Sequence, residues 1–161
     1  VLAEGASADG FQAAFEVLCT RLAPVTLDGL ALTPLGRFLA LTPEGDTAAL
    51  NAMAAEVVRG LDTFRAPPTE ADLARRRQAN LTPAQEANLI QWGYPYVMDA
   101  FRFHITLTSK LPKADLPQVS AALDPYITPH LPQPFVLDSL TLVGQSEDGM
   151  FHEVHRAALS G

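Results

Sequence analysis

Seven consecutive residues of this chain alternate between polar and apolar side chains. The run reads Arg102-Phe103-His104-Ile105-Thr106-Leu107-Thr108. Because successive side chains of a β-strand point to opposite faces, the three apolar residues are expected to face a core and the four polar residues to share the other face. That face would combine an imidazole that can transfer protons with two hydroxyls and a guanidinium that can bind a phosphate. The alternative is an edge strand whose polar face is only solvated.

Three neighbouring arginines and a pair of tyrosines form a second group of candidate site residues. Arg75, Arg76 and Arg77 are the only basic run of the chain. One of them could direct its fork-shaped guanidinium at a phosphate; the alternative is a solvated last helical turn, where the helix dipole favours cations. Tyr94 and Tyr96 flank a stiff proline and could form a wall for a sugar or base, unless they only pack the linker.

An internal repeat indicates how these residues are positioned. Residues 24–32 (PVTLDGLAL) resemble residues 134–142 (PFVLDSLTL), with five of nine positions identical at an offset of 110. A helical pattern precedes each copy and a strand pattern follows each copy. The expected helices run from Gly10 to Leu22 and from Asp115 to Leu131, and the expected following strands from Phe38 to Thr42 and from Phe151 to Ala158.

The two expected helices are amphipathic, with apolar residues at helical spacing. Asp9 is the expected N-cap of the first helix. The inward residues of the first helix are Phe11, Ala14, Phe15, Leu18 and Leu22, and those of the second are Leu116, Val119, Leu123, Tyr126 and Ile127.

The middle of the chain matches neither copy of the repeat. It predicts a helix from Asp46 to Leu61, a short helix capped by Thr69 that ends at Arg77, and a helix that starts at Thr82-Pro83 and ends at Trp92-Gly93. We read this section as an insertion that links the two halves and could cover a cleft between them.

The strand of His104 precedes the helix of the second half. Subtracting the offset of 110 places the equivalent of His104 before Val1. We therefore expect an upstream segment, outside the sequence shown, to carry the partner strand.

Two halves that each offer one His-x-Thr to a shared cleft resemble the 2H phosphoesterase superfamily. More closely, the chain resembles its branch of phosphonate metabolism proteins, an uncharacterised-domain family. The resemblance is carried by four strings: residues 64–67 (FRAP), 73–77 (LARRR), 92–97 (WGYPYV) and 101–108 (FRFHITLT).

The resemblance implies an α+β fold with two pseudo-symmetric lobes of mostly antiparallel sheet, backed by helices, around a central cleft. It implies a single domain over residues 1–161, with 1–45 as the remainder of the first lobe, 46–100 as the helical insertion and 101–161 as the second lobe. The expected activity is metal-independent cleavage of a small phosphate ester such as a cyclic phosphodiester, without a cofactor. The expected catalytic residues are His104 and Thr106, and the expected substrate-binding residues are Arg102, Thr108, Tyr94, Tyr96, Arg75 and Arg76.

Composition limits the partners. The net charge of −7 argues against binding to long nucleic acids, which usually requires a basic patch. No apolar run approaches the roughly 20 residues of a membrane span, and the single Cys19 cannot form a disulfide within the chain, so we expect a cytoplasmic protein. The expected partner is a small phosphorylated substrate, a cyclic phosphate or a phosphosugar. Two other functions stay open: a non-catalytic nucleotide- or phosphosugar-binding module, and a 2′,3′-cyclic phosphodiesterase acting on RNA ends.

Overall fold

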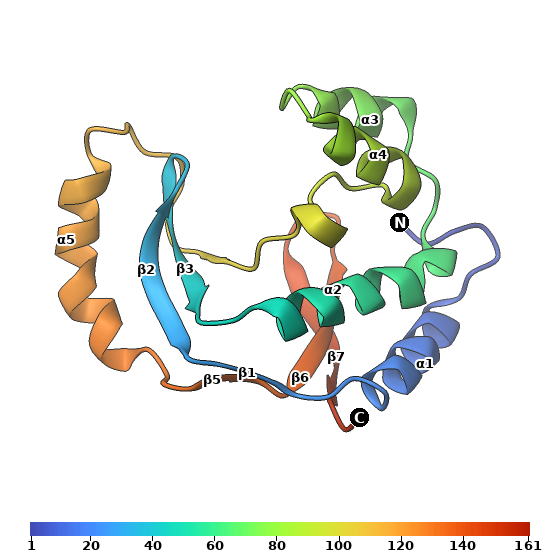
Figure 1. Ribbon diagram of the computed structural model, residues 1–161. Coiled ribbons are helices and arrows are strands. Elements are labelled where there is room, and N and C mark those ends of the chain that lie inside the picture. The colour runs from blue at the N-terminus through green and yellow to red at the C-terminus, as the bar shows by residue number, and fades with distance from the viewer. The chain divides into compact units, whose positions relative to one another are not determined.

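A computed structural model describes all 161 residues and confirms the α+β class. Five α-helices accompany small sheets in which the strands pair antiparallel (Figure 1). The helices are α1 (Ala8–Cys19), α2 (Ala48–Leu61), α3 (Glu70–Arg77), α4 (Pro83–Trp92) and α5 (Leu116–Ile127). The strands are β1 (Val25–Leu27), β2 (Gly29–Leu35), β3 (Phe38–Glu44), β4 (Ile105–Thr106), β5 (Phe135–Leu137), β6 (Ser139–Gln145) and β7 (Phe151–Ala158). Short 3₁₀ helices η1, η2 and η3 span Asp62–Phe64, Met98–Ala100 and Thr128–His130.

The chain divides into two compact units, each made of several segments. Unit 1 contains Val1–Pro24, Leu50–Phe101 and Leu137–Gly161, and unit 2 contains Val25–Ala49 and Arg102–Val136. The candidate residues of the 102–108 run therefore belong to unit 2, whereas Arg75, Arg76, Tyr94 and Tyr96 belong to unit 1.

Unit 2 is a three-stranded sheet with one helix. The strand order is β2-β3-β4, and α5 runs alongside the β2–β3 hairpin, which it contacts (Figure 1). The central strand β3 contributes Leu39, Ala40 and Leu41 to the core, with at most 8% of each residue exposed. Gly36 makes the tight turn of the hairpin with a positive φ of 64°, a conformation that suits glycine. The sheet therefore offers β4 a buried neighbour on one side.

Unit 1 pairs a different helix with a different hairpin. Helix α1 contacts β6 and β7 and buries Phe15, Leu18 and Cys19. Strands β6 and β7 pair antiparallel, and the register shifts between Leu142 and Val143. This is the irregularity that an extra residue in one strand produces.

The internal repeat is visible in the element boundaries. β1 and β5 have equal lengths and start 110 residues apart, at Val25 and Phe135, and the same holds for β2 and β6, at Gly29 and Ser139. β1 also pairs with β5. The helices are exchanged between the copies, because α1 contacts the later hairpin and α5 the earlier one. Each unit thus combines a helix from one half of the chain with a hairpin from the other.

The helices predicted for the middle section form as expected. Thr69 caps α3 and Thr82 caps α4, each in a reciprocal capping box with the residue three positions later, Asp72 or Gln85. Gly93 ends α4 in a left-handed conformation with a φ of 73°. In Figure 1, α3 and α4 lie side by side, and an ion pair joins them, since Arg77 Nη2 lies 2.7 Å from Glu86 Oε1.

Two predictions about helices are wrong. The N-cap of α1 is Ser7 rather than Asp9, because the helix already begins at Ala8 and the Ser7 hydroxyl accepts a hydrogen bond from the Gly10 amide. Tyr126 of α5 does not face inward but is 77% exposed. In α5, only Leu116 in the first turn is fully buried. The apolar residues of this helix therefore continue beyond the part of it that is buried.

The strand predicted over residues 102–108 is much shorter in the structure. Regular pairing covers Ile105 and Thr106 alone. The apolar side chains expected in a core are also not buried: Phe103 is half-buried, and Ile105 and Leu107 are 41% and 36% exposed. β4 is the outermost strand of its sheet, and an edge strand has a neighbour on one side only, which explains this exposure.

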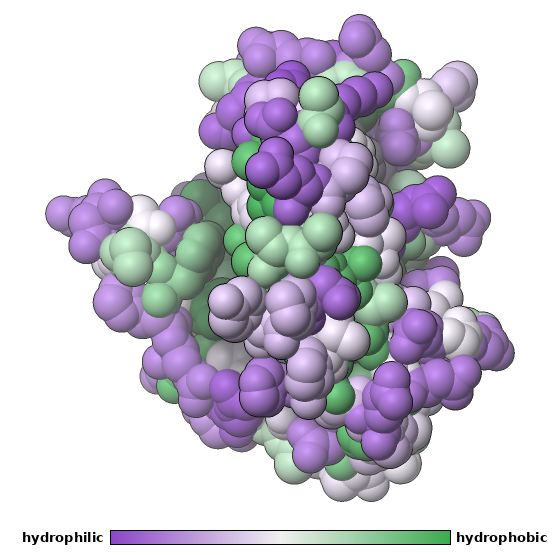
Figure 2. Space-filling view, turned by 90° about the vertical axis from the view of Figure 1, so that its left-hand side faces the viewer, coloured by the Kyte–Doolittle hydropathy of each residue, from purple (hydrophilic) through white to green (hydrophobic).

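One face of the molecule is shown by residue hydropathy in Figure 2. Figure 2 shows hydrophilic residues over most of the viewed face, with hydrophobic residues in smaller patches between them. None of the helices has the length and apolar character needed to cross a bilayer. Cys19 is 1% exposed, and burial together with the charge of Glu16 raises the pKa of its thiol.

Candidate active site

Backbone contacts of Leu39 in β3 position the segment that follows β4. The Leu39 carbonyl accepts hydrogen bonds from the amides of Leu107 and Thr108, at 2.9 and 3.4 Å. The Leu39 amide donates in turn to the Thr108 hydroxyl at 3.0 Å. Leu107 and Thr108 thus both bond to Leu39. This two-to-one pairing interrupts the regular ladder of hydrogen bonds and ends β4 at Thr106. Because Leu39 is fully buried, this segment is tied to the core of unit 2 by its backbone.

The imidazole of His104 has a defined orientation. Its Nδ1 lies 2.8 Å from the carbonyl oxygen of Arg102, and its ring lies 5.8 Å from the ring of Phe38. A carbonyl oxygen can only accept a hydrogen bond, so Nδ1 must carry the proton and donate it. In the neutral ring the lone pair is then on Nε2. His104 is exposed and can therefore exchange a proton with a ligand through Nε2.

The two threonines of the motif differ in how their hydroxyls are used. The Thr108 hydroxyl donates to the Ser109 carbonyl at 2.9 Å and accepts from Leu39, so it stabilises the segment itself. The Thr106 side chain is exposed and makes no hydrogen bond within the chain. Arg102 is exposed as well, and its guanidinium has no carboxylate partner. Thr106 and Arg102 are thus available to a ligand without the loss of an internal contact.

The three arginines of α3 have different contacts. Arg75 Nη2 lies 2.7 Å from Asp72 Oδ1, and Arg77 donates from both Nε and Nη2 to Glu86 Oε1. Arg76 forms no ion pair, and its Cζ lies 4.7 Å from the centroid of the Tyr94 ring, a cation–π distance. The sequence left open which arginine could meet a phosphate, and the contacts distinguish Arg76 from its neighbours.

The Tyr94-Pro95-Tyr96 segment presents two rings outward. Pro95 is almost completely buried, whereas each tyrosine is 39% exposed. The rings meet edge to face, with centroids 5.6 Å apart and planes at 73°. The Asn88 amide of α4 donates to the carbonyls of Pro95 and Val97, at 3.4 and 2.9 Å, and so fixes the backbone of the segment.

The predicted site residues thus form two groups. Arg102 and His104 are joined by a hydrogen bond in unit 2, and Arg76, Tyr94 and Tyr96 are in ring contact in unit 1. Sequence patterns missed Phe38, which packs on the imidazole, and Asn88, which holds the tyrosine segment. Neither residue lies in a motif, and no local sequence signal could have identified them.

Ionisable groups in the arginine-rich helix are shifted by local contacts. A hydrogen bond from the Thr69 hydroxyl, followed by one from the Thr69 backbone and by the charges of Arg75 and Arg76, lowers the pKa of Asp72. The Glu86 carboxylate raises the pKa of Arg77. No group of three His, Cys, Asp or Glu side chains gathers in a way that could hold a metal ion.

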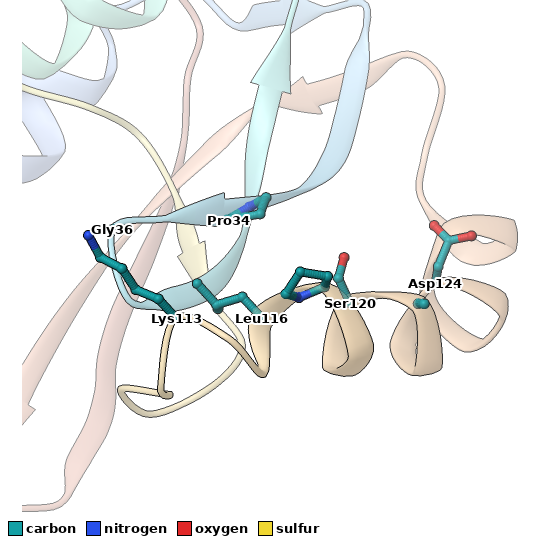
Figure 3. Close-up of a pocket in the computed structure, with 8 residues that line it drawn as sticks. Pro34, Gly36, Lys113, Leu116, Ser120 and Asp124 are labelled. Atoms are coloured by element: carbon teal, nitrogen blue, oxygen red, sulfur yellow. The ribbon is translucent and has the colours of Figure 1, made fainter.

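An open groove in unit 2 lies between α5 and the end of β2. In Figure 3, Lys113 lies beside Gly36 at one end and Asp124 at the other, with Pro34, Leu116 and Ser120 between them. None of the predicted site residues lines this groove. Its two charged side chains, Lys113 and Asp124, are of opposite sign, so the groove as a whole does not favour an anion.

Comparisons with known proteins add a family and two relatives. The sequence profile of the family described as "Protein of unknown function (DUF1045)" matches residues 1–152. A protein of Janthinobacterium sp. (strain Marseille) named ribose 1,5-bisphosphate phosphokinase PhnN is 36% identical over 148 residues, which are 89% of this chain and 33% of that protein. A protein of the same name from Laribacter hongkongensis (strain HLHK9) is 35% identical over 152 residues, 92% of this chain and 34% of that protein. The chain spans about a third of the length of these relatives.

Proposed function

The chain belongs to the family described as protein of unknown function DUF1045, and from this membership we propose that it is a 2H-type phosphoesterase for small ribosyl phosphates. In this proposal it cleaves a small cyclic phosphodiester without a metal ion or cofactor, in a cleft between two pseudo-symmetric lobes. The relatives are named for a kinase of a ribose bisphosphate, which favours a phosphate on a ribose ring. The resemblance of the sequence to phosphonate metabolism proteins favours a role in phosphonate use.

The observation that carries the proposal is the hydrogen bond from His104 Nδ1 to the Arg102 carbonyl. It leaves Nε2 as the nitrogen that accepts a proton from water, or returns one to the leaving oxygen once the ring is protonated. A second acid–base group would complete the pair. A general base and a general acid would both act through Nε2, so the proposal applies whichever of these two roles His104 has.

The hydroxyl and the guanidinium beside His104 would bind the phosphate. The Thr106 hydroxyl would donate to a non-bridging oxygen, where negative charge accumulates as the bond to the attacking oxygen forms. Arg102 would pair with the same phosphate through its planar N–H groups. Thr108 would act by holding the segment on β3, as its contacts with Leu39 and Ser109 suggest.

The test is hydrolysis of cyclic nucleotides and cyclic ribose phosphates by the full-length protein and by His104→Ala. We expect the variant to lose at least ~100-fold in kcat, the size of effect typical of general acid–base groups. His130→Ala is the matched control, since His130 is an exposed histidine of η3 in the same unit. Near-normal turnover by His104→Ala would remove His104 from the mechanism.

A chelator tests the remaining part of the proposal. Excess chelator should leave the rate unchanged. Activity that disappears with the chelator and returns with zinc or manganese would contradict the metal-independent scheme. If the intact protein binds these phosphates and never turns them over, the chain is a binding module instead.

A further inference from the structure

Arg76 and the two tyrosines beside it form a group with the properties of a ligand site. The Arg76 guanidinium lies over the Tyr94 ring, and the Tyr94 ring meets Tyr96 edge to face. We infer that Arg76 binds the phosphate of a ribosyl phosphomonoester while the tyrosine pair packs against its sugar or base. This inference deepens the proposed function and rests on it for the choice of a ribosyl compound.

Arg76 has no direct hydrogen-bonding or ion-pair partner within unit 1, although its charge contributes to lowering the pKa of Asp72. The carboxylate of Asp72 is taken by Thr69 and Arg75, which donate to it at 2.7 Å. The carboxylate of Glu86 is likewise paired with Arg77 of α3. Arg76 makes no hydrogen bond or ion pair, although it is only partly exposed. A half-buried guanidinium without an anion is an attractive partner for one from solution.

Stacking on a ring leaves the hydrogen-bonding edge of a guanidinium available. The five N–H donors of arginine lie in the plane of the group, whereas its contact with Tyr94 uses the face. The ring therefore holds Arg76 in place without occupying a donor, and the fork can meet two phosphate oxygens at once. Lysine could supply the charge at this position but neither the flat face nor the fork.

The tyrosine segment is held rigidly enough to act as a platform. Pro95 is buried between the two outward rings, and Asn88 bonds the backbone on either side of Tyr96. Gly93 sets the direction of the segment, because it ends α4 with a φ of 73°. A platform fixed in advance loses little conformational freedom when a ligand binds. Both tyrosine hydroxyls are without partners in the chain and can bond to ribose hydroxyls.

Equilibrium dialysis with radiolabelled ribose 5-phosphate tests this inference directly. We expect Arg76→Ala to raise Kd at least about 10-fold, since a charge-assisted pair of hydrogen bonds is lost. Arg76→Lys should recover only part of the affinity. Tyr94→Leu should weaken binding several-fold by removing the ring that supports Arg76, and Tyr94→Phe should weaken it less, because it keeps the ring and loses only the hydroxyl. Circular dichroism and thermal melting check that each variant is folded.

Arg59→Ala is the matched control, because Arg59 is a cation of the same unit and is already paired with Glu56. It should leave Kd within about twofold of the unmodified protein. Equal losses in Arg59→Ala and Arg76→Ala would show a diffuse effect of positive charge and overturn the inference.

Two further ligands distinguish the parts of the site. Inorganic phosphate should bind more weakly than ribose 5-phosphate, and adenosine monophosphate shows by comparison whether the rings prefer a sugar or a base. Equal affinity for inorganic phosphate and ribose 5-phosphate would overturn the role of the tyrosines, and absence of binding would overturn the site. Dialysis involves no turnover, so its outcome is independent of the His104→Ala experiment.

Discussion

Units 1 and 2 each pack one helix against one antiparallel hairpin, but their hairpins differ in what flanks them. In unit 2, β3 lies between β2 and β4 and buries Leu39, Ala40 and Leu41. In unit 1, β6 and β7 form a two-stranded sheet, and Phe151 and Val154 of β7 are 67% and 58% exposed. Repeated sequence patterns thus gave a buried central strand in one unit and an exposed edge strand in the other.

The candidate residues of the two units are supported differently as a consequence. The His104 segment is bonded to Leu39, a fully buried residue of the central strand. Arg76 lies on α3, and Tyr94 lies in the segment that follows α4. Helix α3 buries no residue, and α4 buries Leu89. Capping boxes, an ion pair and the Asn88 amide hold this region instead. Apolar burial supports one group, and local polar contacts support the other.

Alanine substitutions of one apolar residue in β3 and one in β7 should show the largest difference between the units. Leu39→Ala should lower the free energy of unfolding by about 2–5 kcal/mol, because it removes a fully buried side chain and leaves a cavity. Val154→Ala should change it by less than about 0.5 kcal/mol, since most of the valine is already in water. Urea denaturation of both variants measures the values. Similar losses would mean that β7 is covered as well as β3.

Glycines with positive φ give the next largest effect. Alanine at Gly36, where φ is 64° and no atom lies near the added Cβ, should cost roughly 1–2 kcal/mol from backbone strain alone. At Gly93, with a φ of 73°, the added Cβ would also lie 2.8 Å from Arg65 Nη1, which is part of a guanidinium bonded to Asp62 and the Gln91 carbonyl.

Gly93→Ala should therefore destabilise the protein by about 1 kcal/mol more than Gly36→Ala, as the Arg65 contacts weaken. Thermal melting of the two variants compares them directly. If Gly36→Ala were the more destabilising, Arg65 would not be a support of unit 1, and the contrast between local polar contacts and apolar burial would weaken.

Local patterns were sufficient to predict most elements, because these elements depend on near neighbours in the sequence. The caps at Thr69 and Thr82 and the strand from Phe151 to Ala158 are set by a few adjacent residues, and all three are confirmed. The repeat also predicted equal strands 110 residues apart, which the boundaries at Gly29 and Ser139 match.

The burial of the His104 strand could not be predicted in the same way. Alternation identifies the two faces of a strand, but whether Ile105 meets a core depends on which strands flank it, and β4 lies at the edge. The orientation of the His104 ring depends on the backbone at Arg102. The distinction between Arg76 and its neighbours depends on how α3 lies against α4. These are properties of tertiary contacts rather than of residue order.

Substitutions of the two threonines of the His104 segment test whether one hydroxyl serves stability and the other serves turnover. Thr108→Val keeps the shape of the side chain but removes the hydroxyl bonded to the Leu39 amide, and should cost about 1 kcal/mol of stability with turnover changed little. Thr106→Val should leave stability within about 0.5 kcal/mol. Under the proposed function it should lower kcat about 100-fold, as expected for a lost donor to the developing charge.

Denaturation curves and rates on a cyclic ribose phosphate measure both effects. The reverse pattern, with Thr106→Val unstable and Thr108→Val inactive, would exchange the assigned roles. It would also show that the contact between Leu39 and Thr108 is not what ties the segment to the buried strand.

The smallest effect concerns the capping box of α3 in unit 1. Because its contacts with Thr69 lower the pKa of Asp72 below 3.8, the folded state binds the Asp72 proton less readily than the unfolded state does. Its contribution is therefore complete above about pH 4–5 and is lost as pH falls through the lowered value. Asp72→Asn should be slightly less stable than the unmodified protein at pH 6, and the difference should shrink as the pH falls and the carboxylate is protonated.

Urea denaturation at several pH values between 2 and 6 measures this difference. Gln85→Ala is the control, because Gln85 fills the same position in the capping box of α4 and carries no charge. Its loss of stability should be the same across this range. A difference for Asp72→Asn that stayed constant from pH 6 to pH 2 would show that the box acts through its geometry and not through the carboxylate charge. The cap of α3 would then make no electrostatic contribution to stability. The two units would differ only in how much apolar surface supports their candidate residues.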